Sequence, residues 1–262
     1  MRSTSQRWPL FEFHEQPWFP DVWRKLVQRA LGRSIGHLHV WGAAVDLLTT
    51  FLERSRPNSV LELASGSGEL STGVWHRLAA SQGHTPDLVL SDLYPDPEAF
   101  AARRTQSPDR VRSVDRSVDA LDPPHDPQRA WLMLQSLHHF SPSQVSHLLR
   151  NATQNSAGFL AIESTRRNPL HTLAVLLATP LFVWVTCTLK PFHWRHLLWG
   201  LLIPVVPLTL VVDGILSNLR SYSTQDLETL ASQLDDTMHW EVGTAKVPHL
   251  PGFRMVYLMV WR

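Results

Sequence analysis

Short apolar runs alternate with helix-like stretches over residues 56–165, and this alternation limits the possible folds more than any other feature. The runs have the aliphatic and β-branched content of strands; they are Ser59–Leu63, Leu88–Ser91, Val111–Val114, Trp131–Leu134 and Phe159–Glu163. Strands that alternate with helices form a parallel sheet with helices on both faces. The sequence therefore predicts an α/β fold with a doubly wound, mostly parallel sheet.

The chain of 262 residues divides by composition into four segments. Residues 1–55 form a predicted N-terminal helical cap, because apolar residues such as Trp23, Leu26 and Val27 recur there at steps of three and four. Residues 56–168 form the predicted core, and residues 169–212 a predicted apolar helical hairpin inserted into it. Residues 213–262 complete the core, with a final strand predicted over Phe253–Trp261.

Charge and cysteine content exclude several classes of protein. The 24 basic and 23 acidic side chains leave a net charge of +1, so we expect no nucleic-acid partner. Cys187 is the only cysteine, which excludes an internal disulfide and fits a cytoplasmic protein. Residues 1–9 lack the apolar stretch of a secretory signal.

The 14 histidines raise the question of a metal site. None of them forms the helix-spaced pair with an intervening glutamate that metalloproteases use. His193 and His196 stand three residues apart, a spacing at which they could chelate an ion adventitiously. From these spacings we expect no bound metal.

The turn after the first predicted strand carries the clearest chemical signal. Gly66 and Gly68 lack a Cβ atom, so a ligand can approach the backbone there. A dinucleotide site would place a third glycine where Ser71 stands, and its pyrophosphate would face the negative charges of Glu62 and Glu69. A carboxylate at Glu62 instead complements the ammonium group of S-adenosylmethionine (SAM). The turn therefore favours SAM over NAD.

Later strand ends add further candidates for this site. Asp92 follows the second strand, where it could accept hydrogen bonds from both ribose hydroxyls, or else cap a helix. Asp119 and Ala120 could face an adenine edge, although Asp119 fits a solvated loop equally well. Gln135 follows the fourth strand at the same predicted edge of the sheet, where open α/β folds bind ligands.

Residues 56–165 resemble the class I SAM-dependent methyltransferases, because the acidic strand end, the glycine turn, Asp92, Asp119 and the histidine segment occur in the usual order. Pro17–Pro20, Ser136–Phe140 and Asp213–Arg220 resemble a bacterial subgroup with an apolar insertion. The resemblance implies a Rossmann-like fold and SAM as cofactor. The cofactor-binding positions that it implies, in the order of the chain, are Glu62, Ala64, Gly66, Gly68, Asp92, Asp119, Ala120 and Gln135. Ala64 is a departure, since the commonest form has a glycine there.

Methyl transfer requires alignment of the reactants, exclusion of water and, for a protonated nucleophile, a base. Histidine suits that task because its ordinary pKa lies near neutrality. We expect His138 or His139 to be the catalytic base, although each could equally be a packed or surface histidine. His14 and Tyr222 are weaker candidates. Glu163 is expected to form a salt bridge with Arg166 or Arg167.

The insertion holds two apolar stretches, Leu170–Cys187 and Leu197–Val212. A membrane-spanning helix needs about 20 apolar residues, so the first stretch barely qualifies and the second is too short. Pro180, Pro204 and Pro207 are expected to interrupt both helices. A lid over the pocket, a hairpin dipping into a membrane interface and a two-span hairpin remain alternatives.

All three arrangements imply an apolar entrance. We therefore expect a SAM-dependent methyltransferase that acts on a hydrophobic small-molecule or lipid-like acceptor, located in the cytoplasm or at the inner face of the membrane. The alternatives are a membrane-associated SAM-binding protein without turnover and, less well supported, a dinucleotide-binding oxidoreductase. The sequence predicts no oligomeric state.

Overall fold

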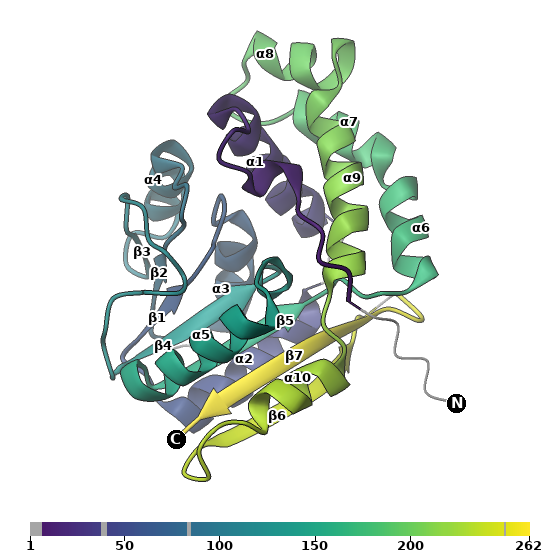
Figure 1. The fold of residues 1–262 in the computed structure, drawn as a ribbon. Coiled ribbons are helices and arrows are strands. Elements are labelled where there is room, and N and C mark those ends of the chain that lie inside the picture. Colours follow the sequence, from purple (N-terminus) through teal and green to yellow (C-terminus); the bar gives the residue numbers. More distant parts are fainter. Residues whose placement is uncertain (1–6, 38–40, 83–84, 249) are drawn as a thin grey trace.

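A single seven-stranded sheet in the order β3-β2-β1-β4-β5-β7-β6 organises the molecule (Figure 1). The computed structural model describes residues 7–37, 41–82, 85–248 and 250–262. The strands are β1 (Ser59–Glu62), β2 (Asp87–Leu90), β3 (Val111–Ser113), β4 (Arg129–Leu134), β5 (Gly158–Glu163), β6 (His239–Lys246) and β7 (Arg254–Trp261). The first five pair in parallel, and β7 lies antiparallel between β5 and β6. The predicted α/β, doubly wound fold is confirmed.

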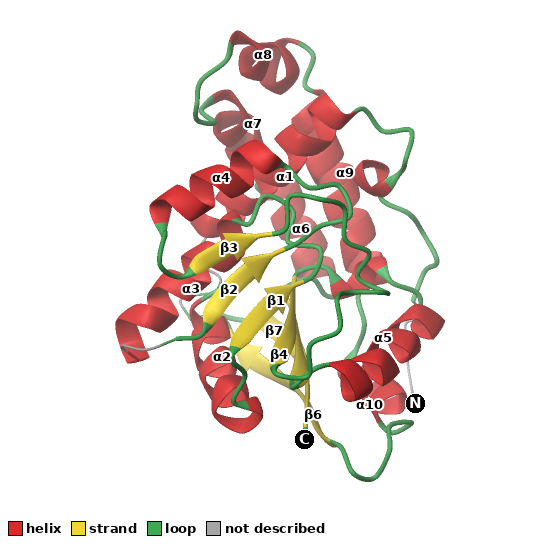
Figure 2. Cartoon of the chain, turned by 90° about the vertical axis from the view of Figure 1, so that its left-hand side faces the viewer, coloured by secondary structure: helices red, strands yellow, loops and turns green. Residues whose placement is uncertain are grey.

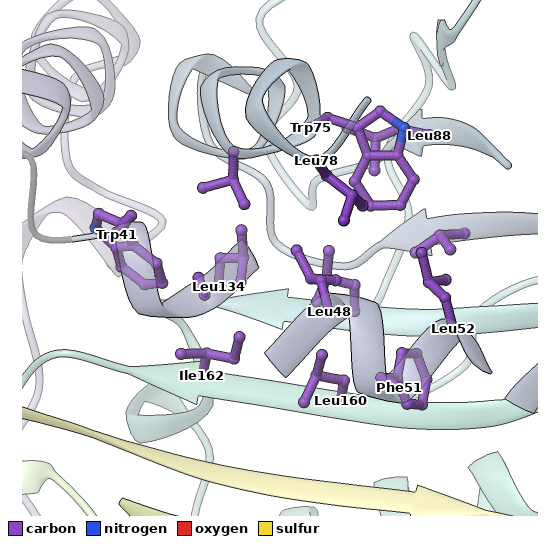
Figure 3. Packing of buried hydrophobic residues seen from close by; sticks show 14 of the residues in the cluster. Trp41, Leu48, Phe51, Leu52, Trp75, Leu78, Leu88, Leu134, Leu160 and Ile162 are labelled. Carbon is purple, nitrogen blue, oxygen red and sulfur yellow. The ribbon is translucent and has the colours of Figure 1, made fainter. Parts of the chain in front are cut away.

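Helices cover both faces of this sheet, because successive side chains of a strand point to opposite faces. Val60, Leu132 and Leu160 pack on one face with α2 (Gly42–Ser55), α3 (Glu69–Gln82) and α4 (Pro97–Gln106). Their neighbours Leu61 and Trp131 pack on the other face with α5 (Pro142–Asn155) and α10 (Thr224–Ala231). Figure 3 shows the first of these two cores, in which the aromatic rings of α2 and α3 lie over the strands.

The remaining helices form a cap above the carboxyl ends of the parallel strands (Figure 2). They are η1 (Phe13–Glu15), α1 (Asp21–His37), α6 (Pro169–Leu177), α7 (Thr179–Cys187), α8 (Trp194–Leu197), η3 (Leu198–Leu202) and α9 (Val205–Arg220). A third apolar cluster, which includes Val27, Val185 and Leu210, joins α1, α7 and α9. The N-terminal segment and the apolar insertion therefore form one layer, and α9 runs through the predicted boundary at residue 212.

The two arms of the insertion are bent where prolines were expected to interrupt them. Pro180 lies in the first turn of α7, where the chain bends by 42° after α6, and Pro204 lies in the 57° break before α9. Pro207 lies in the first turns of α9, which continues past it. Within the described residues no one helix combines the length and apolarity to span a bilayer, although the two bent pairs meet that criterion by length and composition.

Strand β6 was not expected from the sequence. It lies at the edge of the sheet, its side chains are mostly half-exposed, and it contains a glycine. An edge strand that covers little of the core needs no run of apolar residues. Pairing with β7 over eight positions, and not the pattern of its own residues, therefore defines this strand.

A short 3-10 helix, η2 (Leu137–His139), follows β4. It is the point at which the sheet meets the cap, since it contacts both β5 and α9. This contact positions the histidine segment between the two layers.

Candidate active site

The turn between β1 and α3 has the backbone of a ligand-binding loop. Ala64, Gly66 and Gly68 have φ angles of 53°, 57° and 66°, in the left-handed region that glycine tolerates best. A Cβ atom on Gly68 would lie 2.5 Å from Leu90 Cδ1, so a larger residue would require the buried Leu90 side chain to move. Ala64 takes the same left-handed geometry with a Cβ atom, at a cost of about 1 kcal/mol.

A cavity of about 270 Å³, here named the turn cavity, lies beside this turn. Seven of the ten predicted site residues line it: Ala64, Gly66, Asp92, Asp119, Ala120, Gln135 and His139. Glu62, Gly68 and His138 do not line it. The carboxyl ends of β1, β2 and β4 thus bring together residues that lie up to 75 positions apart.

Glu62 ends β1 and is buried beneath the turn. Burial raises the pKa of its carboxyl group to about 8, and the nearby charge of Asp92 adds to this increase. Its Oε2 atom has no hydrogen-bond partner in the described structure. Glu62 is therefore a buried acceptor that a positively charged donor would complement.

The carboxylate of Asp92 accepts hydrogen bonds from the turn and from its own loop. Oδ2 accepts from the backbone N–H of Gly66 and Oδ1 from that of Tyr94, each at 2.8 Å. Burial nevertheless raises the pKa of Asp92. The helix-capping alternative is wrong for Asp92, because the cap of α4 is Asp96, which accepts from the N–H of Ala99. Asp92 therefore remains on the cavity wall with lone pairs available to a ligand.

Gln135 and Asp119 both line the turn cavity. Gln135 has a φ of 59°, and its Oε1 accepts from the N–H of Ser164 at 2.8 Å, so its orientation is fixed. Asp119 accepts from the N–H of Leu121 at 2.9 Å in a turn. Asp119 thus stabilises a loop and also lines the cavity, and its contact with an adenine edge stays a prediction.

His138 lies between two carboxylates. It is buried, its Nδ1 donates to Glu163 at 2.7 Å, and its Nε2 lies 3.4 Å from Glu12. Burial alone would lower its pKa, but the charges of Glu163 and Glu12 outweigh burial and raise the pKa to about 10. Both ring nitrogens of His138 already face carboxylates and the residue does not line the turn cavity, so its role as a base stays a prediction. The salt bridge predicted between Glu163 and Arg166 or Arg167 is wrong, because Glu163 pairs with His138.

His14 and His139 meet the geometric requirement better. Both line the turn cavity, and both also line a second cavity of about 130 Å³, the cap cavity. His14 Nδ1 lies 2.8 Å from Asp213 Oδ2, and His139 Nδ1 contacts Glu15. Tyr222 does not fit the role of a base, since it lines neither cavity, its hydroxyl donates to the carbonyl of Phe140 and burial raises its pKa to about 12.

The cap cavity joins apolar walls to a polar floor. Its walls come from α1, α7 and α9, with Val27, Phe182 and Leu210 as examples. Its floor contains His14, His139, Glu12, His138, Asp213, Ser217 and Thr165. The two cavities share His14, Leu31, Ile35, Gln135 and His139, so they meet at the two histidines.

The polar floor belongs to a histidine–carboxylate cluster that sequence reasoning missed. Its members are Glu12, His14, Glu15, His138, His139, Glu163, Asp213 and Arg220, of which only the histidines and Glu163 were singled out. Arg220 donates to both oxygens of Glu15 at 2.9 Å, and Asp213 accepts from the backbone N–H groups of Phe13 and His14. The sequence held one signal for this cluster: residues 11–15 combine two acids and a histidine with two phenylalanines.

Solved methyltransferase structures resemble this fold. The plantazolicin methyltransferase BpumL, solved with SAH, matches over 92% of this chain and 96% of its own, with a TM-score of 0.53 and 11% identity. Human N-acetylserotonin methyltransferase, solved with SAM, matches over 96% of this chain and 62% of its own, with a TM-score of 0.53 and 13% identity. An O-methyltransferase candidate from Nostoc punctiforme matches at a TM-score of 0.49 and 15% identity, and this chain spans 57% of its length.

No protein-family model matches this chain, and no curated protein matches its sequence. At the identities above, the likeness concerns the fold. The strand order with β7 inserted antiparallel between β5 and β6 agrees with it. By its structure, this chain has the fold of the class I SAM-dependent methyltransferases.

Proposed function

We propose that the protein is a SAM-dependent methyltransferase that acts on a hydrophobic small molecule. This proposal rests on the connection between the two cavities. The turn cavity lies beside the glycine turn and its buried carboxylates, and it shares His14 and His139 with the cap cavity, whose walls are apolar. The SAM and SAH bound by the neighbouring structures support the choice of cofactor.

The residues of the glycine turn and the turn cavity fit this cofactor. The unpartnered Oε2 of Glu62, buried at the end of β1 and outside the cavity lining, complements a cationic ammonium group. Gly66 leaves room for the ligand at the turn, and Asp92 can accept from ribose hydroxyls. Asp119, Ala120 and Gln135 line the same cavity as candidates for further contacts. Bound SAM supplies an electrophilic methyl group.

The chain's own task is then to orient the acceptor, exclude water and remove a proton. The apolar walls of the cap cavity hold a hydrophobic acceptor with its nucleophile toward the histidines. His14 is the best-placed base, because Asp213 holds its Nδ1 and no described residue engages its Nε2. His14 Nε2 would accept the proton that the acceptor atom loses when it takes the methyl group from bound SAM, which would leave as SAH.

The test is transfer of label from isotopically labelled SAM to a panel of acceptors. We expect product with hydrophobic acceptors and none with polar ones, and a loss of SAH affinity of at least tenfold in Asp92→Asn. Asp115→Asn, on the surface, is the matched control. Binding of SAH without transfer would instead support a binding protein, and preferential thermal stabilisation by NAD would support an oxidoreductase.

A location at the inner face of a membrane is the second part of the proposal. Large apolar side chains are exposed on the insertion, among them Leu177, Trp184, Trp194 and Leu202. Lys190 lies in the segment between the two arms of the insertion. A cation in this position could contact the headgroups of a bilayer. We expect the protein to sediment with anionic phospholipid vesicles, and Leu202→Glu with Trp194→Ala to abolish this. The control is Leu93→Glu, which changes an exposed leucine outside the insertion. Equal sedimentation of all variants would exclude the insertion as the membrane-contacting surface.

A further inference from the structure

We propose that Glu12, Glu15, His138 and His139 form a binding site for one divalent transition-metal ion, with zinc as the best fit. Glu12 Oε1 lies 3.4 Å from His138 Nε2 and 3.8 Å from His139 Nδ1, and ligand atoms of the three residues all lie within 4.8 Å of one another. Tetrahedral zinc ligands at their usual bond lengths lie about 3.3 Å apart. Small side-chain shifts would therefore bring these atoms around one ion.

The fourth position is filled by Glu15. Its Oε1 contacts His139 Nδ1 directly, so a second carboxylate already lies beside the three ligand atoms. Two imidazoles with two carboxylates suit zinc, iron or cobalt, whereas calcium and magnesium prefer oxygen ligands alone. The donor set thus identifies the chemical class of the ion.

A second, independent observation is the partner of the outer nitrogen of His138. Glu163 Oε2 accepts from His138 Nδ1 at 2.7 Å, which leaves Nε2 directed toward Glu12. Metal-binding histidines almost always have a carboxylate or carbonyl in this position, because it fixes the ring and makes the ligating nitrogen more basic. Glu163 is itself held by the backbone N–H of Leu137.

Charge balance agrees with a divalent ion. Three buried or half-buried carboxylates, Glu12, Glu15 and Glu163, contact the two imidazoles, and one guanidinium, that of Arg220, contacts the first two of them. With both imidazoles neutral, as ligation of a metal requires, two negative charges remain, and a divalent cation supplies two positive charges in place of the protons that the imidazoles release. Arg220 contacts Glu12 and Glu15 without being a ligand, while Asp213 pairs with His14, whose Nδ1 also lies 3.8 Å from Oε2 of Glu12.

The ion would join two distant parts of the chain. Glu12 precedes η1 in the cap and Glu15 is its last residue, whereas His138 and His139 belong to η2, which follows β4. The site therefore fastens the cap to the sheet beside both cavities. This role does not depend on methyl transfer, so its test can fail while the proposed function stands, and the reverse.

The experiment is calorimetric titration of untagged, chelator-treated protein with Zn²⁺. We expect one ion per chain, with affinity at least tenfold weaker in Glu12→Gln and in His139→Asn. The matched control is His193→Asn, which removes the adventitious pair with His196 and should leave the affinity unchanged. Absence of binding, or a loss confined to His193→Asn, would overturn the proposal.

A measurement on the unaltered protein avoids any dependence on the folding of variants. X-ray absorption of the zinc-loaded protein should show two imidazole ligands together with oxygen ligands at about 2.0 Å. Replacement by Co²⁺ should give the intense visible absorption of a tetrahedral site. A spectrum with one imidazole or none, or with six oxygen ligands, would contradict the assignment.

Discussion

At the scale of single residues, Ala64 departs from the rule that glycine occupies left-handed backbone positions. Its φ of 53° places a Cβ atom in the left-handed region. We expect Ala64→Gly to raise the free energy of unfolding by about 0.5–1 kcal/mol, because release of strain outweighs the added flexibility of the unfolded chain. Thermal or urea unfolding measures this. The control is Ala80→Gly, in the regular helix α3, which should lower the free energy of unfolding by about 1 kcal/mol. Equal decreases in both variants would contradict the proposed strain at Ala64.

His14 gives a second prediction at this scale, on the pH dependence of turnover. Burial lowers its pKa, but the hydrogen bond to Asp213 and the charge of Glu12 outweigh burial, so the pKa lies above the ordinary 6.5. A base acts in its neutral form, so kcat should fall as pH decreases through this raised pKa. In Asp213→Asn the fall should move to lower pH, and in His14→Gln it should disappear. An unchanged profile in Asp213→Asn would remove His14 from the mechanism.

At the scale of elements, helix α5 is defined by its ends as much as by its apolar face. Ser141 Oγ accepts from the N–H of Gln144, and the Gln144 side chain accepts from the N–H of Ser141, which together form a capping box. Removal of this cap in Ser141→Ala should cost about 1 kcal/mol of unfolding free energy. Ser146→Ala, within the same helix, is the matched control and should change it by less than 0.5 kcal/mol. Similar losses in both variants would mean that the cap contributes little.

Elements also show which parts of the fold could be predicted from sequence. Strands β1, β2, β4, β5 and β7 were predictable because each is a compact apolar run buried by helices. Strand β3, of which only Val111 is buried, was predicted from the alternation of strands with helices. The edge strand β6 was not, since its partner defines it. The histidine–carboxylate cluster was missed for a similar reason, as Glu12 and His138 lie 126 positions apart and meet only when η1 packs on η2 and α9. Local patterns predict elements, whereas contacts between layers require the fold.

At the scale of the whole molecule, the buried carboxyl of Glu62 links ligand binding to stability. Burial raises its pKa from 4.5 to about 8, so between these values the folded state holds a proton that the unfolded state has released. Stability from this group is therefore present at low pH and lost as pH rises toward 8, by on the order of a few kcal/mol. The isosteric, uncharged variant Glu62→Gln should lose less stability than the parent protein between pH 5 and pH 8, as urea unfolding at each pH would show.

The same group should respond to the proposed ligand. An ammonium beside Glu62 favours the carboxylate, so affinity for SAH should rise with pH up to about 8 in the parent protein. In Glu62→Gln this rise in affinity should be absent, and the affinity at pH 8 should be lower than in the parent protein. The control is Glu69→Gln, at the more exposed start of α3, which should retain the rise in affinity with pH. Calorimetry with SAH at several pH values makes the comparison. If Glu62→Gln binds with the parent's pH dependence, the ammonium does not lie at the end of β1, and the buried carboxyl must be explained by packing alone.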